Sequence, residues 1–166
     1  AAYFQAKKVP VIHFGKVVTD EVERRYKAQK EEFHKIVREE FRKIHGMAAI
    51  AILNKDLIEK SLLKNNIVVI DGMRSWDEYE YLSAELKDTE VYIVALFAEK
   101  VIRYDRLGSR LHDRRGHGGK DRDLNELFGT NMGPTIAFAD FLIKNNFSKE
   151  EFLDKLEEVY SAVYFS

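Results

Sequence analysis

The sequence lacks cysteine, long apolar runs and any marked excess of charge of one sign. The absence of cysteine excludes disulfide bonds and thiolate metal sites. The formal net charge is only -1, from 27 basic and 28 acidic residues, so no overall field would attract a nucleic acid or an anionic membrane surface. The apolar runs are short and interrupted by charges, and they predict neither a membrane span nor a signal peptide. We therefore expect a cytoplasmic protein without nucleic-acid or membrane partners, in which any affinity for phosphate is local.

The composition of the 166 residues, 45% hydrophobic and 33% charged, is typical of one soluble globular domain with a single core. Short β-rich runs alternate with longer helical segments, a pattern typical of βαβ units. The strand candidates are residues 9–14, 67–71, 91–96 and 141–144. Because these runs are rich in Val, Ile, Leu or Phe, we expect strands that are covered on both faces. The predicted fold class is a three-layer α/β/α arrangement with a mainly parallel sheet.

Helices are predicted between and after these strands. Apolar residues recur at helical spacing at positions 33, 36, 37, 41 and 44, and Gly46 is placed to end that helix. Ser148 and Glu151 have the spacing of a capping box, which opens a last helix with an apolar stripe at positions 152, 153, 156, 159, 160 and 163. We expect this stripe to lie in the core. Residues 1–8 have the character of the end of a helix.

The most informative local pattern is a buried strand that ends in an acid, a glycine and a base, Ile67-Val-Val-Ile-Asp71-Gly72-Met73-Arg74-Ser75. In open parallel sheets, ligands bind beyond the carboxyl ends of the strands. Asp71 is suited to hold a magnesium-bound water, Gly72 allows a close backbone approach, and Arg74 can bind a phosphate with two donors. The alternative is that Asp71 only caps the helix that follows.

A row of arginines is a second candidate for phosphate binding. Arg103, Arg106 and Arg110 are spaced by three and four residues, so they lie along one side of a helix. Guanidinium groups in such a row can neutralise the charge that develops on a phosphoryl group during transfer. The alternative is surface pairing with Asp105 and Glu99.

The one long segment without apolar periodicity is rich in glycine and arginine, and we interpret it as a lid at residues 108–120. Arg114 and Arg115 would bring positive charge to a mobile cover, and Asp121 and Arg122 are candidates for its hinge or latch. A solvated connection without a binding role is the alternative.

Two other classes of chemistry are not expected. The five histidines show no HExxH or comparable metal-ligand spacing, so the sequence predicts no zinc site. Ser75 lies in no GxSxG elbow, and no Ser, His and acid set can be assembled from the sequence, which disfavours hydrolase chemistry.

Several motifs in one order resemble those of the adenylate-kinase-related P-loop proteins of archaeal type, which are grouped with dephospho-CoA kinases. The motifs span nearly the whole chain: VREExRxxHG at 37–46, DGxRS followed by an acidic helix at 71–78, RYxR at 103–106, an RD pair at 122–123, and ADxxIxN at 139–145. The resemblance implies a kinase core that binds ATP and Mg²⁺. It also implies transfer of the γ-phosphoryl group to a nucleoside monophosphate or a nucleotide-like acceptor.

Site residues follow from the motifs and the resemblance together. The catalytic candidates are Asp71, Arg74, Arg106 and Arg110, with Asp71 also the candidate that contacts Mg²⁺ through water. The candidates for binding the acceptor are Gly15, Lys16, Val18, Arg24, Arg38 and His45. The remaining nucleotide-binding candidates are Gly72, Arg103, Arg114 and Arg122 beside phosphates and Asn145 beside the adenine.

The chain departs from this family at two places. Related sequences often carry an acid near the end of the second strand, which in dephospho-CoA kinases is the base, whereas this stretch reads His13-Phe14-Gly15-Lys16; this disfavours dephospho-CoA as the acceptor. The sequence also contains no GxxxxGK[ST] phosphate loop. Either the central strand and this loop lie upstream of Ala1, or the chain is a nucleotide-binding or regulatory module without turnover.

Overall fold

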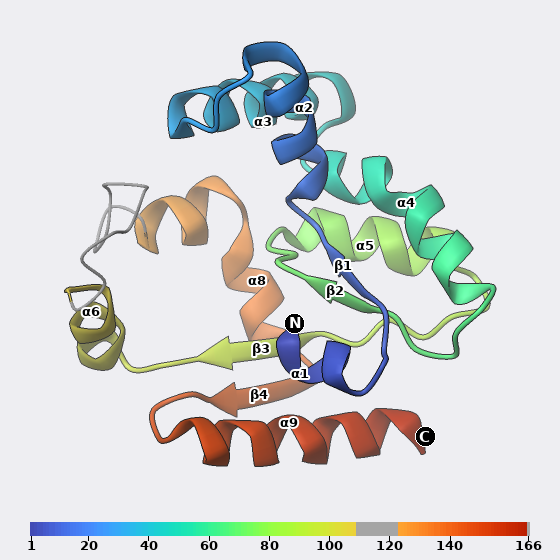
Figure 1. Cartoon of the computed structure of the whole chain (residues 1–166), viewed down its shortest axis with the longest axis vertical. Helices are drawn as coiled ribbons and strands as arrows, with labels where there is room; N and C mark the ends of the chain where they lie inside the picture. Colours follow the sequence, from blue (N-terminus) through green and yellow to red (C-terminus); the bar gives the residue numbers. More distant parts are fainter. Residues whose placement is uncertain (109–122, 166) are drawn as a thin grey trace. The chain divides into compact units, whose positions relative to one another are not determined.

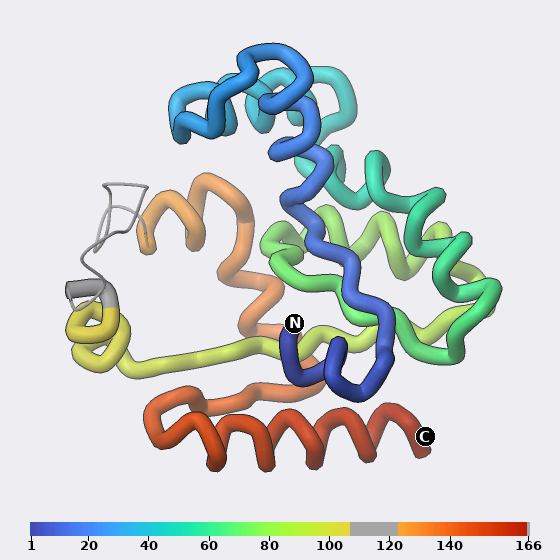
Figure 2. The backbone as a smooth tube through the Cα atoms, viewed as in Figure 1, coloured from blue at the N-terminus to red at the C-terminus, as the bar shows by residue number. Residues whose placement is uncertain are grey.

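The computed structural model describes residues 1–108 and 123–165, and the chain divides into two compact units, Ala1–Val91 and Tyr92–Ser166. The trace of each unit can be followed by its colour in Figure 2. Each unit contains one pair of parallel strands with helices packed beside it (Figure 1). The two units are described one after the other.

The first unit contains the strands β1 and β2, which pair in parallel with Val11 opposite Val69 and His13 opposite Asp71. Its elements are α1 (Ala2–Ala6), β1 (Val11–His13), α2 (Lys16–Tyr26), α3 (Glu31–His45), α4 (Ala49–Leu62), β2 (Val69–Asp71) and α5 (Trp76–Glu85). Two predicted strands and the helical character of the first residues are thereby confirmed. Both strands begin later than predicted, and β1 starts after Pro10, which has no N–H to donate to a partner.

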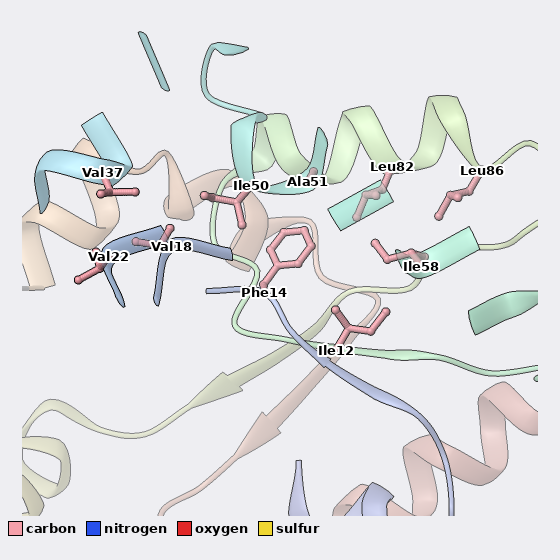
Figure 3. Packing of buried hydrophobic residues seen from close by; sticks show 10 residues of the cluster. All are labelled: Ile12, Phe14, Val18, Val22, Val37, Ile50, Ala51, Ile58, Leu82 and Leu86. Atoms are coloured by element: carbon pink, nitrogen blue, oxygen red, sulfur yellow. The ribbon is translucent and has the colours of Figure 1, made fainter. Parts of the chain in front are cut away.

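The core of this unit gathers beneath the point where β1 leads into α2. Its buried members come from β1, from α2 to α5 and from the residues just after β1 and α5, and they are Ile12, Phe14, Val18, Val22, Val37, Ile50, Ala51, Ile58, Leu82 and Leu86. Figure 3 shows the Phe14 ring, only 1% exposed, directed into this group. The chain segment between β1 and α2 is therefore anchored in the core through the buried Phe14 ring.

Helix α3 ends as its sequence predicts. Val37 on its apolar stripe is fully buried. Gly46 follows the last residue with φ of 75°, a left-handed conformation that glycine adopts without steric cost.

The second unit contains a parallel pair of strands with Val94 opposite Phe141 and Phe97 opposite Lys144. Its described elements are β3 (Val94–Phe97), α6 (Lys100–Gly108), the π-helix η1 (Asn125–Gly129), α8 (Met132–Ala137), β4 (Phe141–Lys144) and α9 (Lys149–Tyr164). Helix α9 packs along β4 (Figure 1). The predicted strand at 141–144 is confirmed without change, and the strand predicted at 91–96 is shifted toward Phe97.

The predicted capping box of α9 is present, because Ser148 Oγ accepts from the Glu151 N–H and the Glu151 carboxylate accepts from the Ser148 N–H. The apolar stripe of this helix is less buried than predicted. Leu156 is buried, whereas the other five stripe residues are only partly covered. One face of α9 thus packs against β4 through a narrow contact.

The structure is an α/β fold with small parallel sheets, as the sequence predicts at that level. Among the described residues both sheets are two-stranded, so each strand keeps one edge without a strand partner. None of the described helices has the length and apolar character needed to cross a membrane.

Candidate functional site

The carboxyl ends of β1 and β2 bring two polar side chains together. His13 and Asp71 are register partners at the last position of each strand. The imidazole Nδ1 of His13 lies 3.0 Å from Oδ2 of Asp71, and the two side chains are 50% and 48% exposed. This edge of a parallel sheet is where ligands of open α/β folds bind.

The loop after β2 is shaped by its own sequence. Gly72 has φ of 95°, and because a Cβ there would meet no atom within 4 Å, the backbone conformation and not lack of space favours glycine. Ser75 is the N-cap of α5, with its Oγ accepting from the Asp77 N–H at 3.2 Å. Asp71 is therefore not the cap of this helix, which excludes the structural alternative considered for it.

The buried side chain of Glu78 is hydrogen-bonded to the backbone of the same loop. Its Oε2 accepts hydrogen bonds from the backbone N–H groups of Arg74 at 3.0 Å and Ser75 at 3.1 Å. The side chain is buried, and burial raises the pKa of the Glu78 carboxyl, against the opposing effects of these two hydrogen bonds and of the charges on Arg42 and Arg74. A buried carboxyl thus determines where the backbone of the phosphate-binding candidate Arg74 lies.

The chain between β1 and α2 is fixed by hydrogen bonds on both sides of Phe14. The Phe14 N–H donates to the Asp71 carbonyl at 2.9 Å, and Nδ2 of Asn54 donates to the Phe14 carbonyl at 3.1 Å. Asn54 is 1% exposed and also donates to the Ile50 carbonyl at 2.8 Å. Sequence reasoning missed Asn54, because a single polar residue in a helical pattern carries no signal of burial.

Gly15 and Lys16 come next, at the N-terminus of α2. Gly15 is the N-cap of this helix, and Lys16 Nζ contacts both carboxylate oxygens of Asp20 at 2.5 and 2.6 Å. Both residues are exposed beside the ends of the strands. The positive charge of Lys16 is therefore already paired on its own helix.

The other acceptor-side candidates have different surroundings. Val18 is 3% exposed and belongs to the core, so the prediction that it contacts the acceptor finds no support in its surroundings. Arg24 is paired with Glu21, and hydrogen bonds from Arg24 and Arg25 lower the pKa of Glu21 to about 2. Arg38 pairs with Glu31 at 2.6 Å and His45 is exposed in the last turn of α3, so the described contacts join neither to the strand ends.

In the second unit, Arg103 pairs with an acid that sequence spacing did not indicate. Its Nη2 donates to Oδ2 of Asp123 at 2.7 Å, and the Tyr104 hydroxyl donates to the same oxygen at 3.0 Å. Within the described residues, the ion pair of Arg103 is with Asp123 and not with Asp105 or Glu99. Asp123 is the acid of the RD pair noted in the sequence.

Two predicted site residues, Arg106 and Asn145, are in direct contact. Arg106 Nη1 donates to the Asn145 carbonyl at 2.6 Å and to its Oδ1 at 3.3 Å, and Nη2 donates to the Phe147 carbonyl at 3.3 Å. Asn146 in the same loop exchanges hydrogen bonds with Glu99. The guanidinium of Arg106 thus spans the loop between β4 and α9.

Three predicted site residues, Arg110, Arg114 and Arg122, lie outside the described residues, as does the predicted lid beyond Gly108. Among the described residues no group of three or more His, Cys, Asp or Glu side chains could hold a metal ion. Mg²⁺ keeps several waters and commonly relies on substrate phosphates. The prediction that Asp71 contacts Mg²⁺ through a water does not require such a group.

Comparison with known proteins gives a consistent set of relatives. A UPF0200 protein of Pyrococcus horikoshii is 32% identical over 98% of this chain and 89% of its own length. UPF0200 proteins of Thermococcus onnurineus and Methanocaldococcus jannaschii are 33% and 30% identical, over 96% and 98% of this chain and 88% and 83% of their own lengths. No protein-family model matches the chain.

Proposed function

The chain belongs to the UPF0200 family, and we propose that this protein transfers the γ-phosphoryl group of ATP to a nucleoside monophosphate or a nucleotide-like acceptor. The observation that carries the proposal is the loop that follows β2. Asp71 is the last residue of a parallel strand, Gly72 and Arg74 come directly after it, and Asp71 has no capping role there.

The loop has the properties that a phosphate site needs. Its backbone is held by Glu78 and by the left-handed Gly72, so little ordering is left to occur when a ligand binds. An arginine at such a position offers a planar group with several donors, which suits phosphate oxygens. Catalysis of phosphoryl transfer depends mainly on positioning and charge stabilisation, and a rigid loop with one arginine contributes to both.

The reaction requires one bond to form and one to break. An oxygen of the acceptor forms a bond to the γ-phosphorus of ATP, the bond from that phosphorus to the β-bridging oxygen breaks, and ADP leaves. A phosphate acceptor uses an oxygen that is already negative, whereas a hydroxyl acceptor also releases a proton. When bound, Mg²⁺ would neutralise charge on the phosphates, while Asp71 orients one of its waters.

The fold part of the proposal is a P-loop kinase-like, three-layer arrangement. Two parallel strand pairs, each with open edges among the described residues, support it. The order of the motifs at 37–46, 71–78, 103–106 and 139–145 supports it as well.

A second candidate function is a nucleotide-binding or regulatory module without turnover. It is favoured by one observation, the absence of a GxxxxGK[ST] loop from the 166 residues. Such a module would keep Arg74 and bind nucleotides without consuming ATP.

A thermal-shift screen with ATP, AMP, other monophosphates and dephospho-CoA tests both candidates. A ligand at about one hundred times its Kd adds about 2.7 kcal/mol of apparent stability, which gives a clear rise in Tm. ADP production with an acceptor then separates the kinase from the binding module. If no nucleotide raises the Tm, both candidates are wrong.

A further inference from the structure

The contact between His13 and Asp71 determines which ring nitrogen of His13 is available to a ligand. A carboxylate oxygen only accepts hydrogen bonds, so Nδ1 of His13 is the donor in the 3.0 Å contact with Oδ2. In a neutral imidazole the other nitrogen then carries the lone pair. His13 therefore presents Nε2 as a hydrogen-bond acceptor.

This acceptor is placed on a rigid support. The register of β1 and β2 and the hydrogen bond from the Phe14 N–H to the Asp71 carbonyl hold both residues. Within the described residues, the contact with Asp71 is the side-chain hydrogen bond of His13, and half of the side chain is exposed. The ring is thus oriented through Nδ1, on a half-exposed side chain at the ends of the strands.

We propose that His13 selects a hydroxyl group, and not a phosphate group, as the acceptor of the phosphoryl transfer. The inference rests on the proposed function, and it names the chemical class of the second substrate as a nucleoside or nucleotide-like molecule that reacts through an alcohol oxygen. His13 is a specificity-determining residue that receives the hydrogen bond of that hydroxyl.

The electrostatics of the site favour a hydroxyl over a phosphate. A hydroxyl has a hydrogen to donate to Nε2, whereas a monophosphate dianion has only acceptor oxygens and would face a lone pair. Lys16, three residues after His13, already forms an ion pair with Asp20, so its charge is not left to offset that of a phosphate.

The transfer forms one bond to phosphorus and breaks one. The alcohol oxygen forms a bond to the γ-phosphorus while the bond from phosphorus to the β-bridging oxygen breaks, with ADP as the leaving group. The hydroxyl hydrogen passes along its hydrogen bond to Nε2 and from there to water. Asp71 keeps the ring in the orientation in which Nε2 faces the alcohol.

The test uses the full natural polypeptide and a substitution that removes only Nε2. In His13→Asn the amide Nδ2 takes the place of Nδ1 and can still donate to Asp71, but nothing replaces Nε2. The matched control is His34→Asn, at a partly buried histidine of α3 whose ring contacts Gln29. The probes are adenosine and dephospho-CoA as alcohols and AMP, which offers both alcohol and phosphate oxygens. Phosphorus NMR of the products separates P–O–C esters from P–O–P anhydrides.

We expect wild type and His34→Asn to form P–O–C esters, and His13→Asn to lose that activity by about a hundredfold or more, with its Tm close to that of wild type. Nitrogen NMR of the wild type should show the hydrogen of His13 on Nδ1. Conversion of AMP to ADP through a new P–O–P anhydride, undiminished ester formation by His13→Asn, or a hydrogen on Nε2 of the neutral ring would overturn the inference and leave the proposed kinase intact. No ADP formation with any probe would instead overturn the proposed function, and the inference with it.

Discussion

The buried side chain of Asn54 donates its amide hydrogen to the backbone carbonyl of Phe14, 3.1 Å away and 40 residues earlier in the chain. Phe14 lies immediately after His13 and before Gly15. A residue in the middle of α4 thereby fixes the backbone between two residues of the candidate site.

Asn54→Leu should destabilise the protein by about 1 to 3 kcal/mol, because the Phe14 carbonyl would remain buried without this partner. Leucine has the same branched arrangement of side-chain heavy atoms, so the substitution removes the hydrogen bond without leaving a cavity. Urea unfolding followed by circular dichroism measures it. Asn65→Leu is the matched control, since Asn65 makes a similar bond to the Ser61 carbonyl in a less buried place. An equal loss in both variants would contradict the special role of Asn54.

Glu78 should make stability decrease as pH rises through the interval just above 4.5. Its pKa is raised in the folded protein, chiefly by burial, so the native state holds a proton there that the unfolded chain has released. Glu78→Gln removes this titration and keeps an oxygen that accepts from Arg74 and Ser75. The stability of the variant relative to wild type should therefore improve as pH rises from 4 to 7.

Urea unfolding at several pH values checks the sign of this dependence. Glu80→Gln, on the exposed side of the same helix, controls for the loss of one negative charge. A constant difference between wild type and Glu78→Gln across the pH range would show that Glu78 does not titrate in this way.

Arg74→Ala should weaken phosphate binding by about tenfold to a hundredfold, the effect of losing hydrogen bonds to a charged group. The substitution leaves the backbone N–H of residue 74 bonded to Glu78, so the loop should keep its shape. Calorimetric titration with ATP and with the acceptor identifies which affinity falls. Lys35→Ala removes one exposed cation from α3 and is the control. Unchanged affinity for both ligands would remove Arg74 from the site.

Arg106→Lys should separate a catalytic role from a structural one. Lysine keeps the charge but cannot span the carbonyls of Asn145 and Phe147 with one planar group. If the role is structural, stability falls by about 1 kcal/mol, and exchange quickens at the Asn145 amide, which donates to the Phe97 carbonyl at 2.7 Å. Unchanged exchange together with a large loss of phosphoryl transfer would instead favour the catalytic role predicted from the arginine row.

The parts of the fold that were predictable are those whose signal is local. The four strand runs, the glycine that ends α3 and the Ser148 capping box depend on residues a few positions apart, and all of them are confirmed in type. The predicted ends of the strands were less accurate, because where a strand begins and ends depends on the neighbouring strand. Pro10, for example, lies within the predicted run and is not part of β1.

The candidate site was predictable only in part, since side-chain partners depend on packing between distant segments. The pattern at Asp71 to Arg74 located the loop, but the pairing of Asp71 with His13, 58 residues away, has no signal in a single sequence. The same holds for Arg103, whose partner is Asp123 and not the nearer acids. The π-helix at Asn125–Gly129 was also missed, because its wider turn leaves no regular apolar spacing.

Ile12 and His13 are consecutive residues of β1 that differ in burial, since Ile12 is 7% exposed and the His13 side chain is 50% exposed. A slip of β1 by one residue against β2 would reverse both, burying an imidazole and exposing an isoleucine whose burial is worth about 1.5 to 3 kcal/mol. The burial of Ile12 therefore fixes the strand register that keeps His13 exposed. Mutations that loosen the packing of Ile12 should make the position of the His13 side chain less well defined, even though they alter no group that could touch a substrate.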